Sequence, residues 1–353
     1  MGNLTFILKS DIEHKDLIVD EINELGGYVE YSSPILPIIA FSGNEEMKDQ
    51  IEKMFDLDYI MVAPEDGKLQ EEGMLTANFS PLQIVPKIDA SKTRNANCHG
   101  WGVEVAVLDS GMSESFIKEH HDFTGYGSTP AIHHGNKVAN IIKRFARGSN
   151  IISCKVAHNP SGIKMIDVLR AVDFVMNSTN ARIINMSLGF GEDIAEDKCP
   201  LCESVNAYSR MKDDVVFVVA AGNEGKEGTI SRPGKAQEAV TVGAITDKGD
   251  AVARYSSKGL PNENKPNILT SGSIYYNQEY DDGTSYSTPI ITGVIAALAS
   301  NNSKPTLSKI KDTLYETADD IQAPRHHQGF GVMNLDRILE VLNYGESNSQ
   351  VEG

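Results

Sequence analysis

The chain has 353 residues, 40% of them hydrophobic, which is enough for the core of one large domain or of two unequal domains. Its formal net charge is −17 at pH 7, and the isoelectric point calculated from the sequence is near 4.9. Such an acidic protein lacks the basic surface that binds a nucleic-acid backbone or an anionic membrane. We therefore expect neither as a partner.

The N-terminal segment and the cysteines indicate the compartment. Residues 1–16 lack the basic start, long apolar core and small-residue cleavage site of a signal peptide. No apolar run reaches the roughly 18 residues that span a membrane. Cys98, Cys154, Cys199 and Cys202 are too few and too unevenly spaced for a disulfide framework. We expect a cytoplasmic protein with reduced thiols, although the last two could form a structural or reversibly oxidised pair.

Residues 1–68 are predicted to form a small α+β domain. Its expected elements, in chain order, are strand 4–9, helix 11–27, strand 27–33, strand 35–43, helix 44–55 and strand 58–66. This order is the split βαβ pattern of a ferredoxin-like unit. The polar residues 69–80, which show no regular period, are predicted to be a linker.

Residues 81–343 are predicted to form an α/β domain with a doubly wound parallel sheet and helices on both faces. Continuous apolar runs, typical of strands buried on both faces, occur at 102–109, 150–157, 181–189, 214–223 and 238–246. Ligands of such sheets bind beyond the carboxyl ends of the strands. Asp109, Ser187 and Asn223 each end an apolar run and should meet there. Residues 344–353 are predicted to be an unstructured tail.

Each chemically active residue has an ordinary structural explanation when taken alone. Asp109 in "VLDSGM" could form a turn, and His134 in "HHGNKVANII" could cap or pack a helix. Asn223 could occupy a left-handed turn, and Ser285 could be a helix N-cap. Taken together these explanations become improbable, because the motifs that contain Asp109, His134, Asn223 and Ser285 all occur in one chain.

The motifs "VLDSGM", "HHGNKVANI", "INMSLGFG", "VVAAGNEG" and "DGTSYSTPIITG" follow one another along the chain. In this order they resemble the motifs of the subtilisin-like serine proteases. The resemblance runs from about residue 78 to about residue 343. It implies a subtilisin-like fold and a serine endopeptidase that hydrolyses peptide bonds.

The resemblance also implies a role for each motif residue. Ser285 is the nucleophile, His134 its general base and Asp109 the group that orients the imidazole. Asn223 donates to the oxyanion together with the backbone N–H of Ser285. Physical chemistry supports the set, since a serine hydroxyl near neutral pH needs a base and the base needs an orienting partner.

The substrate groove follows from the same resemblance. Residues 187–191 are expected to pair with an extended peptide by strand addition. The residues expected to bind substrate are Ser187, Leu188, Gly189, Ala220, Ala221, Gly222 and Ser231. Glu224 and Arg232 are expected near the far end of the pocket, which should accept medium or large apolar side chains.

We expect no metal and no cofactor. The connection between the His134 helix and the strand at residue 150 lacks the Asn-rich insertion that holds calcium in many relatives, so we predict no high-affinity calcium site there. Paired histidines occur at 120–121, 133–134 and 326–327, but their spacing is not that of metal ligands. Cys199 and Cys202 lack a second pair that would complete a zinc site.

The small N-terminal domain resembles the family's inhibitory propeptide. This implies an intramolecular inhibitor, with self-cleavage in residues 70–80 near Met74 and Leu75. The expected external partner is a protein or peptide substrate, and a regulatory protein partner is left open. A pseudoprotease that binds peptides without cutting them is the alternative. A nucleophile-elbow hydrolase is disfavoured because Ser285 lacks the G-x-S-x-G context.

Overall fold

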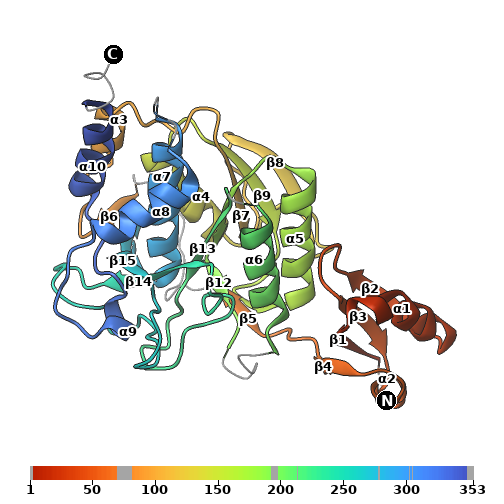
Figure 1. Cartoon of the computed structure of the whole chain (residues 1–353). Helices are drawn as coiled ribbons and strands as arrows, with labels where there is room; N and C mark the ends of the chain where they lie inside the picture. Colours follow the sequence, from red (N-terminus) through yellow and green to blue (C-terminus); the bar gives the residue numbers. More distant parts are fainter. Residues whose placement is uncertain are drawn as a thin grey trace.

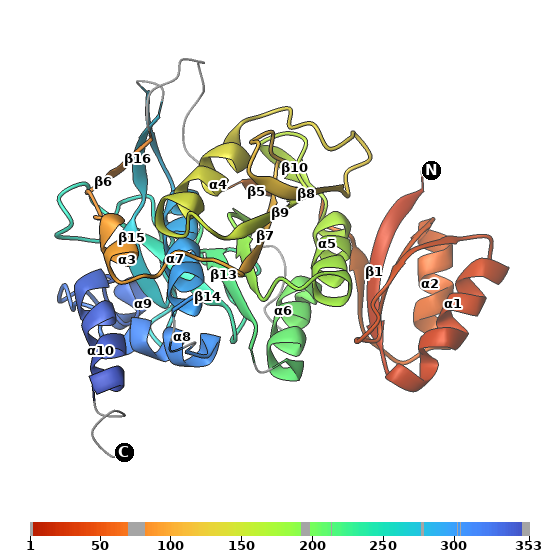
Figure 2. The same cartoon turned by 90° about the horizontal axis from the view of Figure 1, so that it is seen from above.

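The computed structural model describes residues 3–69, 82–191, 198–212, 214–276, 279–301, 303 and 305–347. A large α/β domain carries a small α+β domain on one side (Figures 1 and 2). The predicted cleavage near Met74 and Leu75 lies outside the described residues, as do residues 348–353 of the predicted tail. Residues 344–347 of that tail are helical, because α10 (Leu335–Ser347) continues past residue 343.

The small domain has the predicted order of elements. They are β1 (Leu4–Ser10), the short helix η1 (Ile12–His14), α1 (Lys15–Glu24), β2 (Tyr28–Ser32), β3 (Ile38–Gly43), α2 (Glu45–Met54) and β4 (Leu57–Val62). The strands form an antiparallel sheet in the order β2-β3-β1-β4. Successive side chains of β1 point to opposite faces of the sheet, so Phe6 and Leu8 face the two helices and Ile7 faces the large domain.

Seven parallel strands form the sheet of the large domain, in the order β15-β14-β13-β11-β7-β9-β8. In chain order they are β7 (Glu104–Asp109), β8 (Ile117–Asp122), β9 (Asn150–Lys155), β11 (Ile183–Met186), β13 (Val216–Ala220), β14 (Val240–Ile245) and β15 (Ile268–Ser271). The predicted doubly wound architecture is confirmed. The edge strand β8 was not predicted, because its sequence "IKEHHD" is mostly polar.

Helices cover both faces of this sheet (Figure 1). On one face, α5 (Met165–Ser178) and α6 (Pro200–Met211) share a core with the outer surface of the small domain's sheet. On the other face lie α3 (Ser91–Asn95), α4 (His134–Phe145), α7 (Thr284–Ala299), α8 (Leu307–Glu316) and α10. Helix α7 is apolar all round and buried from Thr284 to Leu298, as expected for a helix in the centre of a domain.

Two three-stranded antiparallel sheets complete the fold. One joins β10 (Ser161–Ile163), β5 (Gly67–Leu69) and β12 (Leu188–Gly189), with β5 in the middle. The other joins β17 (Glu279–Asp282), β16 (Ser273–Tyr276) and β6 (Gln83–Val85). The predicted domain boundary between residues 68 and 69 falls inside β5, which pairs with the large domain on both sides.

Polar contacts also join the small domain to α5 and α6. The Tyr31 and Tyr208 hydroxyls each donate to one carboxylate oxygen of Asp173, both over 2.7 Å. Lys9 forms an ion pair with Glu203 at 2.7 Å. Because burial removes the Asp173 carboxyl from water, its pKa is raised above the ordinary value. The small domain is thus held by hydrogen bonds as well as by apolar packing.

Cys199 and Cys202 form a disulfide at the start of α6. The sequence left the pairing of these two cysteines open, and the structure joins them. Cys98 and Cys154 are buried and take no part in this disulfide, and burial raises the pKa of the Cys154 thiol. Across the residues that the structure describes, every helix is too short or too polar to cross a bilayer.

A buried ion pair links α4 to the segment before α7. The Lys137 ammonium donates to the Asp281 carboxylate, and the two side chains are only 1% and 4% exposed. The Tyr286 hydroxyl lies 3.2 Å from the Lys137 ammonium and donates to Asp281 over 3.3 Å. Removing one partner of such a pair leaves an uncompensated charge in the protein interior.

Replacement of Lys137 tests this pair. We expect Lys137→Met to lower the free energy of unfolding by about 3–5 kcal/mol, because the Asp281 carboxylate stays buried without its cation. The double variant Lys137→Met/Asp281→Leu should recover much of the loss. Chemical denaturation followed by circular dichroism, in a Ser285→Ala background, measures both. An unchanged unfolding midpoint in the single variant would contradict the prediction.

The pH dependence of stability should depend on Asp167 in α5. Burial raises the pKa of this carboxyl from 3.8 to about 6. The folded state therefore binds more protons than the unfolded state between these values, and this group makes the protein less stable as the pH rises through them. Asp167→Asn should raise the melting temperature at pH 7.5 and leave it nearly unchanged at pH 4. Equal gains at both pH values, measured by thermal unfolding, would refute this.

Candidate active site

Asp109 and His134 form the first part of the site. Asp109 ends β7, and His134 begins α4. The carboxylate oxygen Oδ1 lies 2.7 Å from Nδ1 of the imidazole, and both side chains are fully buried. An ionised carboxylate only accepts, so Nδ1 carries the proton and Nε2 is the basic nitrogen of the neutral ring.

The backbone around this pair permits their close approach. Oδ1 of Asp109 also accepts from the backbone N–H of Ser110 over 2.7 Å, which fixes the carboxylate. A Cβ on Gly135 would lie 2.4 Å from the carbonyl oxygen of Gly111. Only glycine therefore fits after His134 where α4 starts beside the end of β7.

Ser285 lies in the first turn of α7, directly after Gly283 and Thr284. Gly283 has φ 153°, a conformation that a side chain would oppose. The Ser285 hydroxyl donates to the Ser187 carbonyl over 3.1 Å, and the Ser187 hydroxyl donates to the Ser285 carbonyl over 3.0 Å. This reciprocal pair fixes the first turn of α7 to the end of β11.

Helix packing brings His134 and Ser285 together. Helix α4 lies along α7 (Figure 2). The His134 ring centroid is 5.9 Å from that of Tyr286, the residue after Ser285. The approach is close because Gly293 faces α4, where a Cβ would lie 2.9 Å from the Ile142 carbonyl oxygen. The structure thus places His134 beside the N-terminus of α7.

Asn223 follows β13 and points at the same helix end. Its Oδ1 accepts from the backbone N–H and from the hydroxyl of Thr284, both over 3.0 Å. The amide orientation is therefore set, and Nδ2 is buried without a hydrogen-bond partner among the described residues. A buried donor left unpaired costs about 1–3 kcal/mol. This cost favours an acceptor arriving from a ligand.

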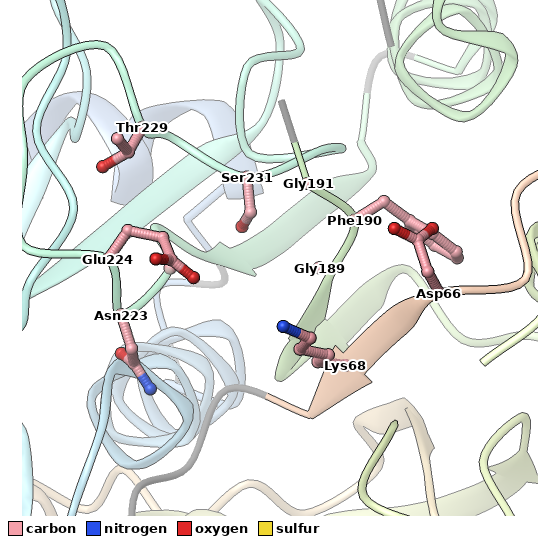
Figure 3. A pocket seen from close by; sticks show the side chains of 10 residues that line it. Asp66, Lys68, Gly189, Phe190, Gly191, Asn223, Glu224, Thr229 and Ser231 are labelled. Carbon is pink, nitrogen blue, oxygen red and sulfur yellow. The ribbon is translucent and has the colours of Figure 1, made fainter. Parts of the chain in front are cut away.

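A cavity of about 270 Å³ opens beside Asn223 (Figure 3). It is lined by Asp66, Lys68, Gly189, Phe190, Gly191, Gly222, Asn223, Glu224, Thr229 and Ser231. The side chains of Lys68 and Glu224 enter it from opposite sides. The cavity is therefore partly polar, with two acidic side chains, Asp66 and Glu224, and one basic side chain, Lys68.

Several residues predicted to bind substrate line this cavity or support it. Gly189, Gly222 and Ser231 line it, as does Glu224. Leu188 belongs to β12, and Ser187, Ala220 and Ala221 are buried and do not line the cavity. Phe190 and Gly191 also line it and belong to residues 187–191, which were expected to pair with an extended peptide, whereas Thr229 was not predicted.

Arg232 does not line the cavity, although it was expected near its far end. Its side chain is buried, and its backbone exchanges hydrogen bonds with Phe190 over 2.9 and 3.0 Å. Asp66 and Lys68, which also line the cavity, come from the N-terminal segment that resembles a propeptide.

The chain's own strand β5 occupies the groove beside this cavity. Leu69 pairs with Leu188 and Lys68 with Gly189, while β10 pairs on the other side. The backbone N–H of Leu69 also donates to the Pro160 carbonyl over 2.9 Å. Such pairing on both sides is how a sheet edge takes up an extended peptide.

Comparison with known proteins gives the same family. Residues 100–331 match the family model described as the Subtilase family, peptidase S8. Alkaline serine exoprotease A of Vibrio alginolyticus is 25% identical over 320 residues, which cover 82% of this chain and 56% of that protein. Subtilisin amylosacchariticus of Bacillus subtilis subsp. amylosacchariticus is 24% identical over 351 residues, which cover 91% and 85%.

A solved structure shares the fold. Fervidolysin from Fervidobacterium pennivorans superposes with a TM-score of 0.71 at 16% identity, over 96% of this chain and 61% of that one. The chain thus spans little more than half the length of the Vibrio protein and of fervidolysin. The matched residues 100–331 include Asp109, His134, Asn223 and Ser285, and the chain belongs to the subtilase family.

Proposed function

We propose that the protein is a serine endopeptidase that hydrolyses peptide bonds of protein substrates. The observation that carries the proposal is the Asp109–His134 hydrogen bond of 2.7 Å beside the helix end that bears Ser285. A carboxylate that orients an imidazole, and an imidazole that removes the proton of a serine, together activate the serine as a nucleophile. Membership of the subtilase family supports the same activity.

In the first step His134 acts as general base. Its Nε2 removes the proton from the Ser285 hydroxyl while Oγ attacks the substrate carbonyl carbon. Asp109, hydrogen-bonded to Nδ1, stabilises the imidazolium that forms. The same nitrogen then gives its proton to the leaving amine, and a water molecule activated by His134 hydrolyses the acyl-enzyme.

Asn223 stabilises the oxyanion of the tetrahedral intermediate. Contacts with Thr284 orient its Nδ2, which is buried without a hydrogen-bond partner in the part of the chain that the structure describes, so it is preorganised for a negative oxygen. The N-terminus of α7 adds the backbone N–H of Ser285 and the positive end of the helix dipole. Both donors are in place before the charge develops.

A pseudoprotease that binds an extended peptide is the alternative. It would use the same groove and the same pairing with β12. Reaction with a fluorophosphonate probe separates the two functions, because the probe labels only an activated serine. We expect stoichiometric labelling at Ser285 in protein whose N-terminal segment has left the groove.

We also propose that the N-terminal domain restrains the enzyme. Three observations support this: β5 fills the groove, the Tyr31–Asp173 hydrogen bond anchors the domain on α5, and Lys9 is paired with Glu203 on α6. Release of the enzyme from this inhibition requires cleavage of the chain after β5 or undocking of the N-terminal domain from α5 and α6. Intact masses of the wild-type chain and of a Ser285→Ala variant would distinguish self-cleavage from a retained domain.

The absence of a calcium site is also part of the proposal. We propose that the α4–β9 connection holds no calcium, since the Lys143 ammonium already donates to the Ser149 carbonyl there over 2.7 Å.

The cytoplasmic location and a regulatory partner stay predictions. Disulfides such as Cys199–Cys202 are more common in proteins of oxidising compartments than in cytosolic proteins.

Two substitutions test the catalytic assignment. Ser285→Ala should abolish turnover and probe labelling. Asn223→Ala should lower kcat by about 10²–10³ with little change in KM, as the loss of the equivalent donor does in a subtilisin. Steady-state kinetics on a fluorogenic peptide, with the N-terminal segment removed, measures both effects. Full activity in either variant would refute the assigned role.

Substitution of Gly67 in β5 tests whether the N-terminal segment inhibits the enzyme. A Cβ at this position would lie 2.5 Å from Cε1 of the buried Phe190 ring. Gly67→Leu should therefore weaken the docking of β5 by about 1–3 kcal/mol, and the basal activity of the full chain should rise about 5- to 100-fold. Lys53→Leu, on the exposed surface of α2, is the control and should leave the activity unchanged. Equal activity of Gly67→Leu and wild type would exclude inhibition by β5.

A further inference from the structure

Glu227, His326 and His327 bring a carboxylate and two imidazoles together outside the active site. Nε2 of His326 lies 3.2 Å and Nε2 of His327 2.8 Å from the same oxygen, Oε1 of Glu227. One ligand atom from each of the three residues lies within 4.8 Å of the others. The histidines were assigned no metal role from their spacing alone, because the acidic partner is about 100 positions away in the chain.

Backbone hydrogen bonds hold these three residues in place. The histidines belong to the short helix α9 (Arg325–Gln328), and the His326 carbonyl accepts from the N–H of Gly259 over 2.8 Å. The neighbouring Lys258 forms a β-bridge with Glu227. The segment 258–259 therefore connects α9 to the loop that carries Glu227. The cluster is built by the fold, rather than by a chance meeting of mobile side chains.

The geometry suits a divalent transition metal. Bonds of about 2.0–2.1 Å in a tetrahedral site separate two ligand atoms by about 3.3 Å, close to the observed 3.2 and 2.8 Å. Two imidazoles and one carboxylate form a ligand set that zinc accepts, with water at the fourth position. The histidine side chains are 13% and 21% exposed and that of Glu227 is 52% exposed, so an ion can reach them from solvent.

Other charges near the cluster leave the ligand atoms accessible. The nearby Lys258 ammonium donates to the Gly225 carbonyl over 2.5 Å, so it is directed to the backbone. The Arg325 guanidinium lies over the Phe330 ring and donates to the Gly329 carbonyl. In the absence of metal, the two imidazole N–H groups share one carboxylate oxygen. A metal ion would replace these two protons.

We propose that Glu227, His326 and His327 form a binding site for Zn²⁺ or a similar divalent transition metal. The site fastens the loop after Asn223, because Glu224 and Thr229 from this loop line the cavity beside the active site. Bound metal thereby joins the wall of the cavity to α9. The site is structural, and its existence does not depend on the catalytic assignment.

The test measures metal binding in an inactive, untagged full-length chain carrying Ser285→Ala. After treatment with a chelator, calorimetric titration with ZnCl₂ should show one saturable site, and bound metal should raise the melting temperature. Titration with Co²⁺ should give the visible absorption of a four-coordinate ion. Glu227→Gln and His327→Gln should each weaken zinc binding at least about tenfold and remove the shift in melting temperature.

His120→Gln is the matched control, since it removes an exposed imidazole on the edge strand β8. It should bind zinc as the parent does. Circular dichroism of each metal-free variant verifies that the fold is intact. The proposal is overturned if no saturable one-to-one binding occurs, or if Glu227→Gln and His327→Gln bind zinc as tightly as His120→Gln does. Because all proteins in the test lack Ser285, neither result bears on the proposed protease activity.

Discussion

The burial of helix α7 is the constraint on which the site depends. Its apolar surface is covered on every side, so its N-terminus ends inside the protein, where backbone N–H groups need partners. Asn223 accepts from Thr284, and Ser187 exchanges hydrogen bonds with Ser285. These contacts leave the Asn223 amide nitrogen and the serine hydroxyl beside one positive helix end. Burial of the helix thereby gathers hydrogen-bond donors and the positive end of the helix dipole at one place.

The parallel sheet explains why residues distant in sequence meet at this helix. Asp109 ends β7, Ser187 follows β11 and Asn223 follows β13, three adjacent strands whose carboxyl ends share one edge. The same edge continues into β12, which offers its backbone to a further strand. In this chain β5 takes that position, and its glycine fits against Phe190. A single topology therefore brings Asp109, Ser187 and Asn223 to one end of the sheet and also forms the strand with which β5 pairs.

The sequence predicted five of the seven strands of the parallel sheet, β7, β9, β11, β13 and β14, because continuous apolar runs are short-range signals. Long-range partners had no such signal. The polar strand β8 forms only by pairing with β9 at the edge of the sheet. Lys137 gave no indication of Asp281, 144 positions away, and His326 gave none of Glu227. The disulfide of Cys199 and Cys202 was left open because spacing alone does not fix the oxidation state of a pair.

The buried cluster of Lys137, Asp281 and Tyr286 adds a further constraint on the catalytic geometry. Lys137 lies one helical turn after His134, and Tyr286 directly follows Ser285. The ion pair therefore joins α4 to β17, and Tyr286 links both to the first turn of α7. A rotation of α4 would separate opposite charges in the protein interior. A buried ion pair contributes little net stability compared with apolar packing, but it strongly penalises arrangements that break it. We infer that this cluster selects one register of α4 against α7, which is the register that brings His134 to Ser285.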